Sequence, residues 1–417
     1  MFKTIAEAFK VKDIRKKILI TLLLLFIYRI GCWIPCVGFS TSIVDTSGSS
    51  FGFFELMNMV SGGALSNCSI LALGVSPYIT ASIVIQLLTV AIPALERAAK
   101  SGEDGRRKIN LYTRIAALVL ALAQAIGIVV AYSGNLDQNL GGFPTWLIGA
   151  GVVITLVAGA MFTVWIGERI TDLGIGNGTS LLIFVGILSS AGQSLFTAIE
   201  LTIADINYIW YILIFIVAVI AIFALIVFID GGERRVNVQY AKQIKGRRMY
   251  GGQSNYIPIK VNATGVMPII FANALLTFPQ LIISIFWPNV TWYSDWLGTN
   301  SWLYIVLTAV LILLFAFFYS KITFDPNDIS KRIQQQGGFI PGIRAGKPTA
   351  DYLGKISGRI TLFGAIFLAV IALVPSLAFK AIGDATTASV LINAFSTTGL
   401  MIVVSVALEL EKQLSAQ

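Results

Sequence analysis

Histidine is absent from this 417-residue chain. Zinc sites commonly use histidine, and it is the most frequent general acid or base, so its absence excludes the usual zinc sites and histidine-based catalysis. The three cysteines, Cys32, Cys36 and Cys68, indicate neither a disulfide framework nor a metal site. No phosphate-binding GxxxxGKS or GxxxxGKT motif occurs. We therefore expect no enzyme, no metal and no cofactor, and we expect a partner to supply any energy that the process requires.

Charge is also scarce. Asp, Glu, Lys and Arg make up 12% of the chain, against about 25% in soluble proteins. Apolar residues make up 56%, mean hydropathy is +0.81, and several windows exceed the roughly 18 apolar residues typical of a membrane helix. Basic residues precede the first apolar run, as in a signal peptide, but that run continues to about residue 37 without a small-residue cleavage site. The composition predicts an integral membrane protein that retains this first run.

Ten apolar segments have the length and composition of membrane spans. The fifth and the tenth are the least apolar of them. This pattern predicts an all-α polytopic membrane protein, because helices satisfy their own backbone hydrogen bonds in lipid. We place the ten spans at 18–37, 74–92, 111–132, 146–166, 179–199, 207–229, 265–287, 302–320, 360–380 and 387–408.

Lysine and arginine are distributed very unevenly between the two sides of these spans. One side holds 28 of the 30: six before the first span, six in 93–114, Arg169, seven in 230–260, seven in 321–359 and Lys412. Such an excess marks the cytoplasmic side of a membrane protein. We therefore expect a cytoplasmic N-terminus at 1–17 and a cytoplasmic tail at 409–417.

Four of the spans, the second, fifth, seventh and tenth, mix apolar residues with Ser, Thr, Asn and Gln. Polar groups at membrane depth bond to a neighbouring helix or face water. Ordinary bonding between helices explains any single residue, but four such helices together favour a shared, partly wet interior. These spans contain no Asp, Glu, Lys or Arg, unlike most ion-coupled transporters, so we infer a passive path. Arg29 is the one charge deep within a span, and we expect it to pair inside the bundle.

Two cytoplasmic loops are larger than topology requires. In 230–262, "RRVNVQYA" and "SNYIPIKVN" alternate polar and apolar residues and predict strands, with "KQIKGRRMYGG" as a basic hairpin tip. Such a tip suits ribosomal RNA or an acidic protein surface, although a solvated loop is the simpler alternative. The 321–358 loop likewise has turn residues such as Pro326 and Pro348, and "PGIRAG" places Arg344 at an exposed tip.

A further short apolar stretch, "FFELMNMVSGGALSN" at 53–67, follows the first span on the external side. It begins like an apolar helix and stops at Ser61-Gly62-Gly63. The stretch is too short to cross a bilayer. Glycine adopts backbone conformations that other residues resist, so this triplet is expected to end the helix and to act as a hinge.

The order of several motifs now indicates a family. The chain resembles the SecY family of protein-translocation channels, in its bacterial form, over essentially its whole length. The resemblance rests on "SGGALS" before "SPYITASIVIQLL", then "GEDGRRKINLYTR", "GERITDLGIGNGTS", "GRRMYGGQSNYIPIKVNATGVMPIIFA" and "ITFDPNDISKRIQQQGGFIPGIRAGKPT". It implies two inverted, pseudo-symmetric halves of five helices, here 18–199 and 200–408. The halves enclose an hourglass pore with a lateral gate between spans two and three and spans seven and eight.

The resemblance also implies roles for individual residues. An aliphatic ring seals the pore waist, and Thr179 departs from the isoleucine usual at its position, so we expect a wetter arc there. The stretch 53–67 resembles the plug, a short helix that caps the outer funnel. Basic loop tips dock partners, and polar residues line the gate. The ring falls on Val75, Ile79, Thr179, Ile183, Ile270 and Ile402; the plug on Phe54, Leu56, Met57, Met59, Val60, Ser61, Gly62 and Gly63; docking on Arg247, Arg248 and Arg344; and the gate on Gln86 and Asn262.

The function that the resemblance implies is a protein-conducting channel in the cytoplasmic membrane. It would pass unfolded secretory polypeptides and release membrane segments sideways into lipid. The implied partners are the small subunits SecE and SecG, the SecA motor or a ribosome, the translocating chain with its signal sequence, and membrane lipids. Composition and topology alone give equal weight to a channel and to a secondary transporter with broken helices. An intramembrane enzyme is a weaker third alternative.

Overall fold

The computed structural model describes residues 11–39, 57–58, 60–132, 136, 144–204, 209–240, 243–245, 248–250, 254–262, 265, 267–286, 301–382, 399, 402–408 and 410. The chain divides into two compact units. The first comprises residues 1–212, 274–304 and 384–417, and the second comprises 213–273 and 305–383. Helix α10 (Met267–Phe286) starts in the second unit and ends in the first.

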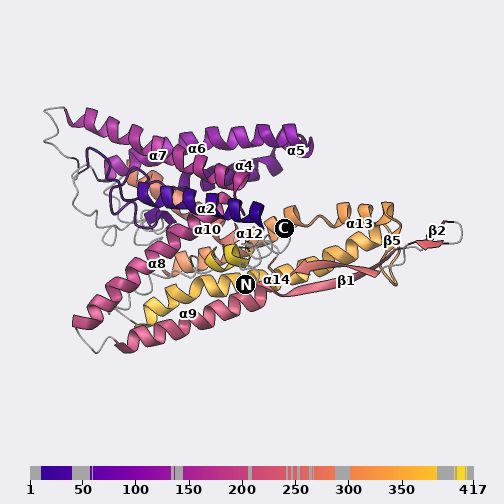
Figure 1. Ribbon diagram of the computed structural model, residues 1–417. Coiled ribbons are helices and arrows are strands. Elements are labelled where there is room, and N and C mark those ends of the chain that lie inside the picture. Colours follow the sequence, from indigo (N-terminus) through magenta and orange to yellow (C-terminus); the bar gives the residue numbers. More distant parts are fainter. Residues whose placement is uncertain are drawn as a thin grey trace. The chain divides into compact units, whose positions relative to one another are not determined.

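The first unit is built from helices that follow one another along the chain (Figure 1). Helix α6 packs against α4 on one side and α7 on the other, α8 packs against α7, and α2 contacts both α7 and α8. Small residues on α6 and α7 allow this close packing, and several of them, such as Ala121, Ala125 and Ala160, are fully buried. The helices are α2 (Lys12–Gly31), α4 (Ser76–Ala91), α5 (Pro93–Lys100), α6 (Glu103–Ala131), α7 (Thr145–Leu173) and α8 (Gly178–Ala204).

Helices α4 and α5 meet at a bend of 107°. Pro93 causes it, because proline has no N–H to continue the ladder and forces the preceding Ile92 into an extended conformation. Gly102, with φ +86°, then allows the chain to turn into α6. The segment between the second and third predicted spans is therefore mostly helical, since α5 and the first turns of α6 occupy it.

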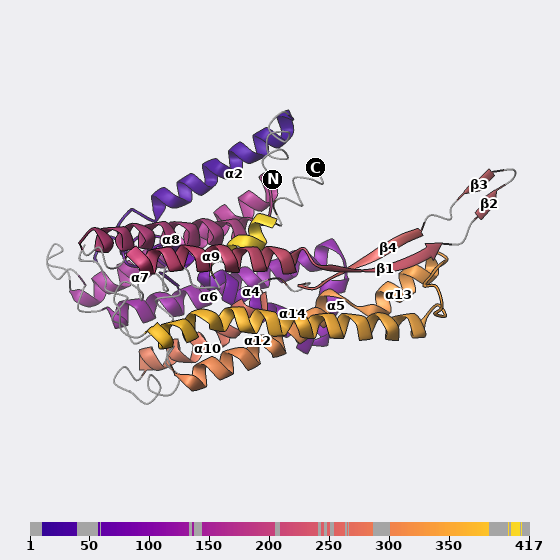
Figure 2. The ribbon, with the colours of Figure 1, turned by 90° about the horizontal axis from the view of Figure 1, so that it is seen from below.

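The second unit contains the described strands and the helices α9 (Ile209–Asp230), α12 (Trp302–Thr323), α13 (Pro326–Gln335) and α14 (Lys347–Ile382). Strand β1 (Glu233–Tyr240) pairs antiparallel with β4 (Ser254–Lys260) over seven residue pairs. Strands β2 (Gln243–Lys245) and β3 (Arg248–Tyr250) pair further out (Figure 2). The two strands and the hairpin predicted in 230–262 are confirmed.

The 321–358 segment is more helical than predicted. Pro326 and Pro348 lie in the first turns of α13 and α14, where a missing N–H is harmless. The Asp325 side chain caps α13 by accepting from the backbone N–H of Asn327 at 2.9 Å. Helix α14 has 36 residues, so it is about 54 Å long and exceeds the roughly 30 Å hydrocarbon core of a bilayer. The two prolines taken as turn residues therefore start helices, and helix occupies most of this segment.

Within the described residues, five stretches are long and apolar enough to cross a membrane: Glu103–Ala131, Thr145–Leu173, Gly178–Thr197, Trp302–Gln335 and Lys347–Leu373. The bent pair Ser76–Ala91 and Pro93–Ala99 is a sixth if it counts as one span. The first helix ends at Gly31, earlier than the predicted 37, and Pro35 then forms an isolated bridge with Ser69. A polytopic helical membrane protein is thus confirmed, while the count of ten and the inverted halves stay predictions.

Candidate functional site

The helix of the predicted plug segment ends at Gly62 and Gly63. The backbone at 57–58 and 60–61 is helical, and Gly62 has φ +73°. The N–H of Gly63 donates to the carbonyl of Asn58 at 2.9 Å, which is the long-range bond of a Schellman helix end. The predicted break at Ser61-Gly62-Gly63 is confirmed. Phe54, Leu56 and Met59 lie outside the described residues.

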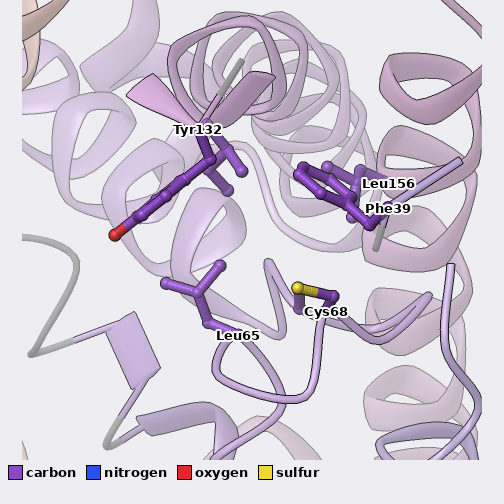
Figure 3. Close-up of a pocket in the computed structure, with 7 residues that line it drawn as sticks. Phe39, Leu65, Cys68, Tyr132 and Leu156 are labelled. Atoms are coloured by element: carbon purple, nitrogen blue, oxygen red, sulfur yellow. The ribbon is translucent and has the colours of Figure 1, made fainter. Parts of the chain in front are cut away.

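The segment is anchored in the apolar core of the first unit. Met57, Leu65 and Cys68 are buried, and they belong to one cluster with small and aliphatic residues of α6 and α7. Figure 3 shows Leu65 and Cys68 at one side of a small apolar pocket that Phe39, Tyr132 and Leu156 also line. Burying each such apolar side chain contributes about 1.5–3 kcal/mol. The described part of the plug segment is therefore a packed element of the first unit.

Two glycines let the backbone of this region come close to the helices. A Cβ on Gly186 of α8 would collide with the carbonyl oxygen of Val60, and one on Gly159 of α7 would collide with that of Ile70. Only glycine leaves this space. The spacing of Ile183 and Gly186, three residues apart on α8, places a predicted ring position beside a plug contact.

Arg29 reaches the same segment from α2. It lies in the last turn of that helix, and its Nη1 donates to the carbonyl oxygen of Gly62 at 2.9 Å. A Cβ on Gly62 would lie 2.5 Å from that Nη1 and 3.0 Å from the carbonyl oxygen of Gly186. The expected pairing of Arg29 inside the bundle is confirmed, and its acceptor is a backbone carbonyl of the predicted plug.

The predicted ring positions of α4 adjoin the plug segment as well. Val75 is fully buried and immediately precedes α4, and Ile79 follows one turn later, half-buried. Gly74 directly precedes Val75, and a Cβ added to Gly74 would lie 3.4 Å from the Ser61 side chain. The structure thus brings the start of α4, the middle of α8 and the end of the plug helix together.

Thr179 sits in the first turn of α8, half-buried. Its hydroxyl donates to Oδ1 of Asn177 at 2.7 Å. Its methyl group lies 3.2 Å from the Cβ position of Gly167 on α7. The hydroxyl therefore already has an acceptor within its own helix start, and the wetter ring arc stays a prediction.

The two remaining ring positions lie apart in the chain. Ile402 is buried in the helical stretch 402–408 of the first unit. Ile270 is half-buried on the part of α10 that belongs to the second unit. Next to it, the Phe271 ring packs edge-on against Phe315 and Tyr319 of α12, at 5.6 Å and 5.7 Å between centroids. Closure of the six positions into one ring stays a prediction.

The two predicted gate residues have different environments. Gln86 is exposed on α4. Asn262 is buried, and its Nδ2 donates to Oδ1 of Asp230 at 3.0 Å. The pair closes the base of the β1–β4 ribbon, since Asp230 ends α9 and Asn262 follows β4. Sequence reasoning missed Asp230, although a lone carboxylate at the end of an apolar helix was a signal for it.

The two large loops predicted to be cytoplasmic form one folded module, the cytoplasmic module, which we define as β1, β4, β5 (Gly338–Phe339), α13 and the start of α14. Strand β1 lies between β4 and β5, with Gln239 opposite Phe339 and Tyr240 opposite Gly338. Figure 2 shows the ribbon running beside α13 and α14. A shared apolar core joins these elements, made of Val236, Val238, Ile259, Ile333, Ile340 and Leu353.

Arg344 stands on a tightly bonded loop of this module. Gly342, at φ +83°, completes a turn in which the N–H of Ile343 donates to the carbonyl of Ile340 at 3.0 Å. The Thr349 hydroxyl donates to the carbonyl of Arg344 itself at 2.8 Å. The Arg344 side chain is exposed, as predicted, on a backbone held by these bonds.

The ribbon presents one arginine that is already paired. Arg235 Nε lies 2.6 Å from Glu233 Oε1, and its guanidinium lies 4.8 Å from the centre of the Tyr256 ring. The hydrogen bond that Arg235 donates to the Glu233 carboxylate raises the pKa of Arg235. The neighbouring Arg234 is exposed. Arg247 and the Arg248 side chain lie outside the described residues, while the Arg248 backbone belongs to β3.

Comparison with known proteins identifies close sequence relatives. The family described as SecY matches residues 69–410. A protein translocase subunit SecY of Streptomyces scabiei is 42% identical over 434 residues, which cover 100% of this chain and 98% of the relative.

Solved structures share the fold at lower identity. One described as the structure of a protein conducting channel has a TM-score of 0.68 at 20% identity and covers 97% of this chain and 93% of its own. A Sec61 chain in the canine ribosome-channel complex from the endoplasmic reticulum has a TM-score of 0.63 at 18% identity and covers 97% and 92%. None of these matches supports the transporter alternative.

Proposed function

Because the chain belongs to the SecY family and is a protein-conducting channel subunit of a protein translocase, we propose that it passes unfolded secretory polypeptides across the cytoplasmic membrane. We further propose that it releases apolar segments sideways into lipid, between the helices predicted to form the gate. The observation that supports this most directly is the plug segment seated against α8 beside Ile183.

The aliphatic side chains at the proposed ring positions account for the resting seal. Aliphatic groups offer water and ions no hydrogen bonds, so a narrow ring of them dewets and blocks leakage. The same groups make no specific bonds to a passing peptide, which suits a pore for many sequences. The plug helix covers the ring from outside, and the glycines that end it allow it to move away. A polypeptide entering the pore would displace it.

The cytoplasmic module would serve as the docking site for the driving partner. Its exposed Arg344 and the ribbon tip with Arg247 and Arg248 offer positive charge to the SecA motor or to ribosomal RNA. The Sec61 relative in a ribosome-channel complex is a precedent for the second partner. We also propose SecE and SecG as companion subunits, with both termini of this chain in the cytoplasm.

Crosslinking tests the channel proposal. A secretory precursor is stalled in vesicles that contain the reconstituted complex, and a photoreactive amino acid replaces Ile79, Ile270 or Ile402. We expect adducts with the stalled chain at all three positions. Ile154, which is strongly exposed on the outside of α7, is the matched control and should give none. If none of the three ring positions yields adducts, the proposed path is wrong.

A further inference from the structure

We propose that Arg29 is the latch that holds the plug in its resting position. The inference rests on the proposed sealing role of the plug and adds a positioning residue that acts on it. Arg29 is the one cation deep within a predicted span, and its Nη1 donates to Gly62 of the plug at 2.9 Å. A charge at membrane depth is unfavourable and usually has a functional reason.

The chosen acceptor suits a cation. Gly62 lies just beyond Ser61, the last helical residue of the plug, and its carbonyl oxygen accepts a hydrogen bond from the charged guanidinium. Arg29 itself lies in the last turn of α2, where a positive charge is favourable. The guanidinium therefore joins the last turn of α2 to the residue that ends the plug helix. Moving the plug separates them.

Gly62 is also in close contact with α8, on the side opposite Arg29. Gly62 lies between Arg29 and α8, where a Cβ would come within 2.5 Å of Nη1 and 3.0 Å of the Gly186 carbonyl oxygen. The plug end is therefore gripped between a side chain of α2 and the backbone of α8. A displaced plug must break the Arg29 bond and leave the Gly186 contact together.

The helix α2 does not depend on this bond for its own packing. Eight residues earlier, the Thr21 hydroxyl accepts from the backbone N–H of Ile175 at 3.2 Å. Two residues later, Gly31 packs against the Leu71 side chain. Ile14, near the start of the helix, packs against Ile175. Arg29 can therefore be replaced while these three contacts hold α2 in place.

Resting ion conductance of the full-length chain, assembled in its complex and reconstituted in lipid bilayers, tests the latch. A hydrogen bond to a charged group contributes roughly 1.5–3 kcal/mol, which corresponds to about a tenfold to hundredfold shift in an equilibrium. We expect Arg29→Met to raise the leak by about tenfold or more, with translocation of a precursor retained. Arg29→Lys keeps the charge and N–H donors on a shorter-reaching ammonium without the planar guanidinium, and it should leak less than Arg29→Met.

The same substitution in a channel that lacks residues 56–66 distinguishes a latch from a general structural role. Deleting 56–66 removes the acceptor, so Arg29→Met should add nothing to the leak of that deletion. A leak that adds fully in both backgrounds would overturn the latch, because Arg29 would then act elsewhere. If the deletion leaks but Arg29→Met stays tight, the latch alone is wrong. If the deletion itself stays tight, the proposed sealing function of the plug is wrong.

Gly62→Ala keeps the test decisive if Arg29→Met does not assemble. The added methyl would push Nη1 away and would strain a backbone at φ +73°. We expect the same leak as from Arg29→Met. In the double variant, the two effects should not add, because both remove one bond. A tight Gly62→Ala channel would count against the latch.

Discussion

Single residues connect elements that the sequence holds far apart. Arg114 of α6 binds Glu168 of α7 through two bonds of 2.7 Å and 2.8 Å, and Asn262 binds Asp230 at 3.0 Å. The first pair is partly exposed, so it contributes little, whereas the Asn262 side chain is buried. Asp230, the group that would lose its partner, is half-buried, so the loss costs less than the roughly 1–3 kcal/mol of a fully buried unsatisfied group but more than that of an exposed pair. The Asn262 bond is therefore the more informative one to remove.

Asn262→Ala should loosen the base of the β1–β4 ribbon. Without the amide, Asp230 loses its bond and the end of β4 loses its side-chain link to α9. We expect trypsin to cleave the 230–262 segment several times faster in the purified complex, read from gels over time. Asn237→Ala, at an exposed position in the middle of β1, is the matched control and should behave as wild type. Equal cleavage of the two variants would contradict the role of the bond.

At the scale of elements, close approach of the backbone positions the plug segment. Helices α7 and α8 each use a glycine where a carbonyl of the region 60–70 touches them, at Gly159 and Gly186. Side chains of the segment fill the core between α6 and α7 at the same time. The module on the second unit follows a different rule, since apolar faces of a strand pair and two helices bury one another.

Gly186→Ala should unseat the plug. The methyl group would collide with the Val60 carbonyl oxygen, so the plug end must shift away from α8. We expect a clear rise in resting ion conductance with little change in helix stability, because alanine favours helices. Gly192→Ala on the same helix meets no atom within 4 Å and is the matched control. The interpretation fails if Gly186→Ala and Gly192→Ala conduct alike.

At the scale of the whole molecule, the described residues divide into two units that carry different parts of the proposed function. The first contains the plug segment and five of the six ring positions, and the second contains the cytoplasmic module and Ile270. The chain passes between the units within α9, α10 and α12. The proposed ring positions are therefore distributed over both units, while the proposed docking residues belong to the second.

Ile402→Asn tests the seal as a property of the assembled channel. The amide would give water hydrogen-bonding partners at a position proposed for the dewetted ring, so the barrier to ions should fall. We expect increased resting ion conductance in bilayers. Ile402→Val keeps an aliphatic surface and should remain tight. Unchanged conductance in the asparagine variant would place the seal elsewhere.

In the two segments predicted to be cytoplasmic, local sequence patterns predict some elements and miss others. Alternation in "RRVNVQYA" predicts β1 correctly because strand periodicity is local. The same approach took Pro326 and Pro348 for turns, although proline fits equally well in the first turn of a helix. Pairing of β1 with β5 joins residues about a hundred positions apart, and no local pattern reports it.

The sequence by itself determined the membrane class, the polar character of selected spans, the break at Ser61-Gly62-Gly63 and, through its ordered motifs, the family. These properties depend on composition and on short-range spacing. Only the tertiary structure decided which groups meet: Arg29 with Gly62, Gly186 with Val60, and Asn262 with Asp230. Each of these contacts depends on the distance between two segments that are far apart in the sequence. Composition and short-range spacing do not determine that distance.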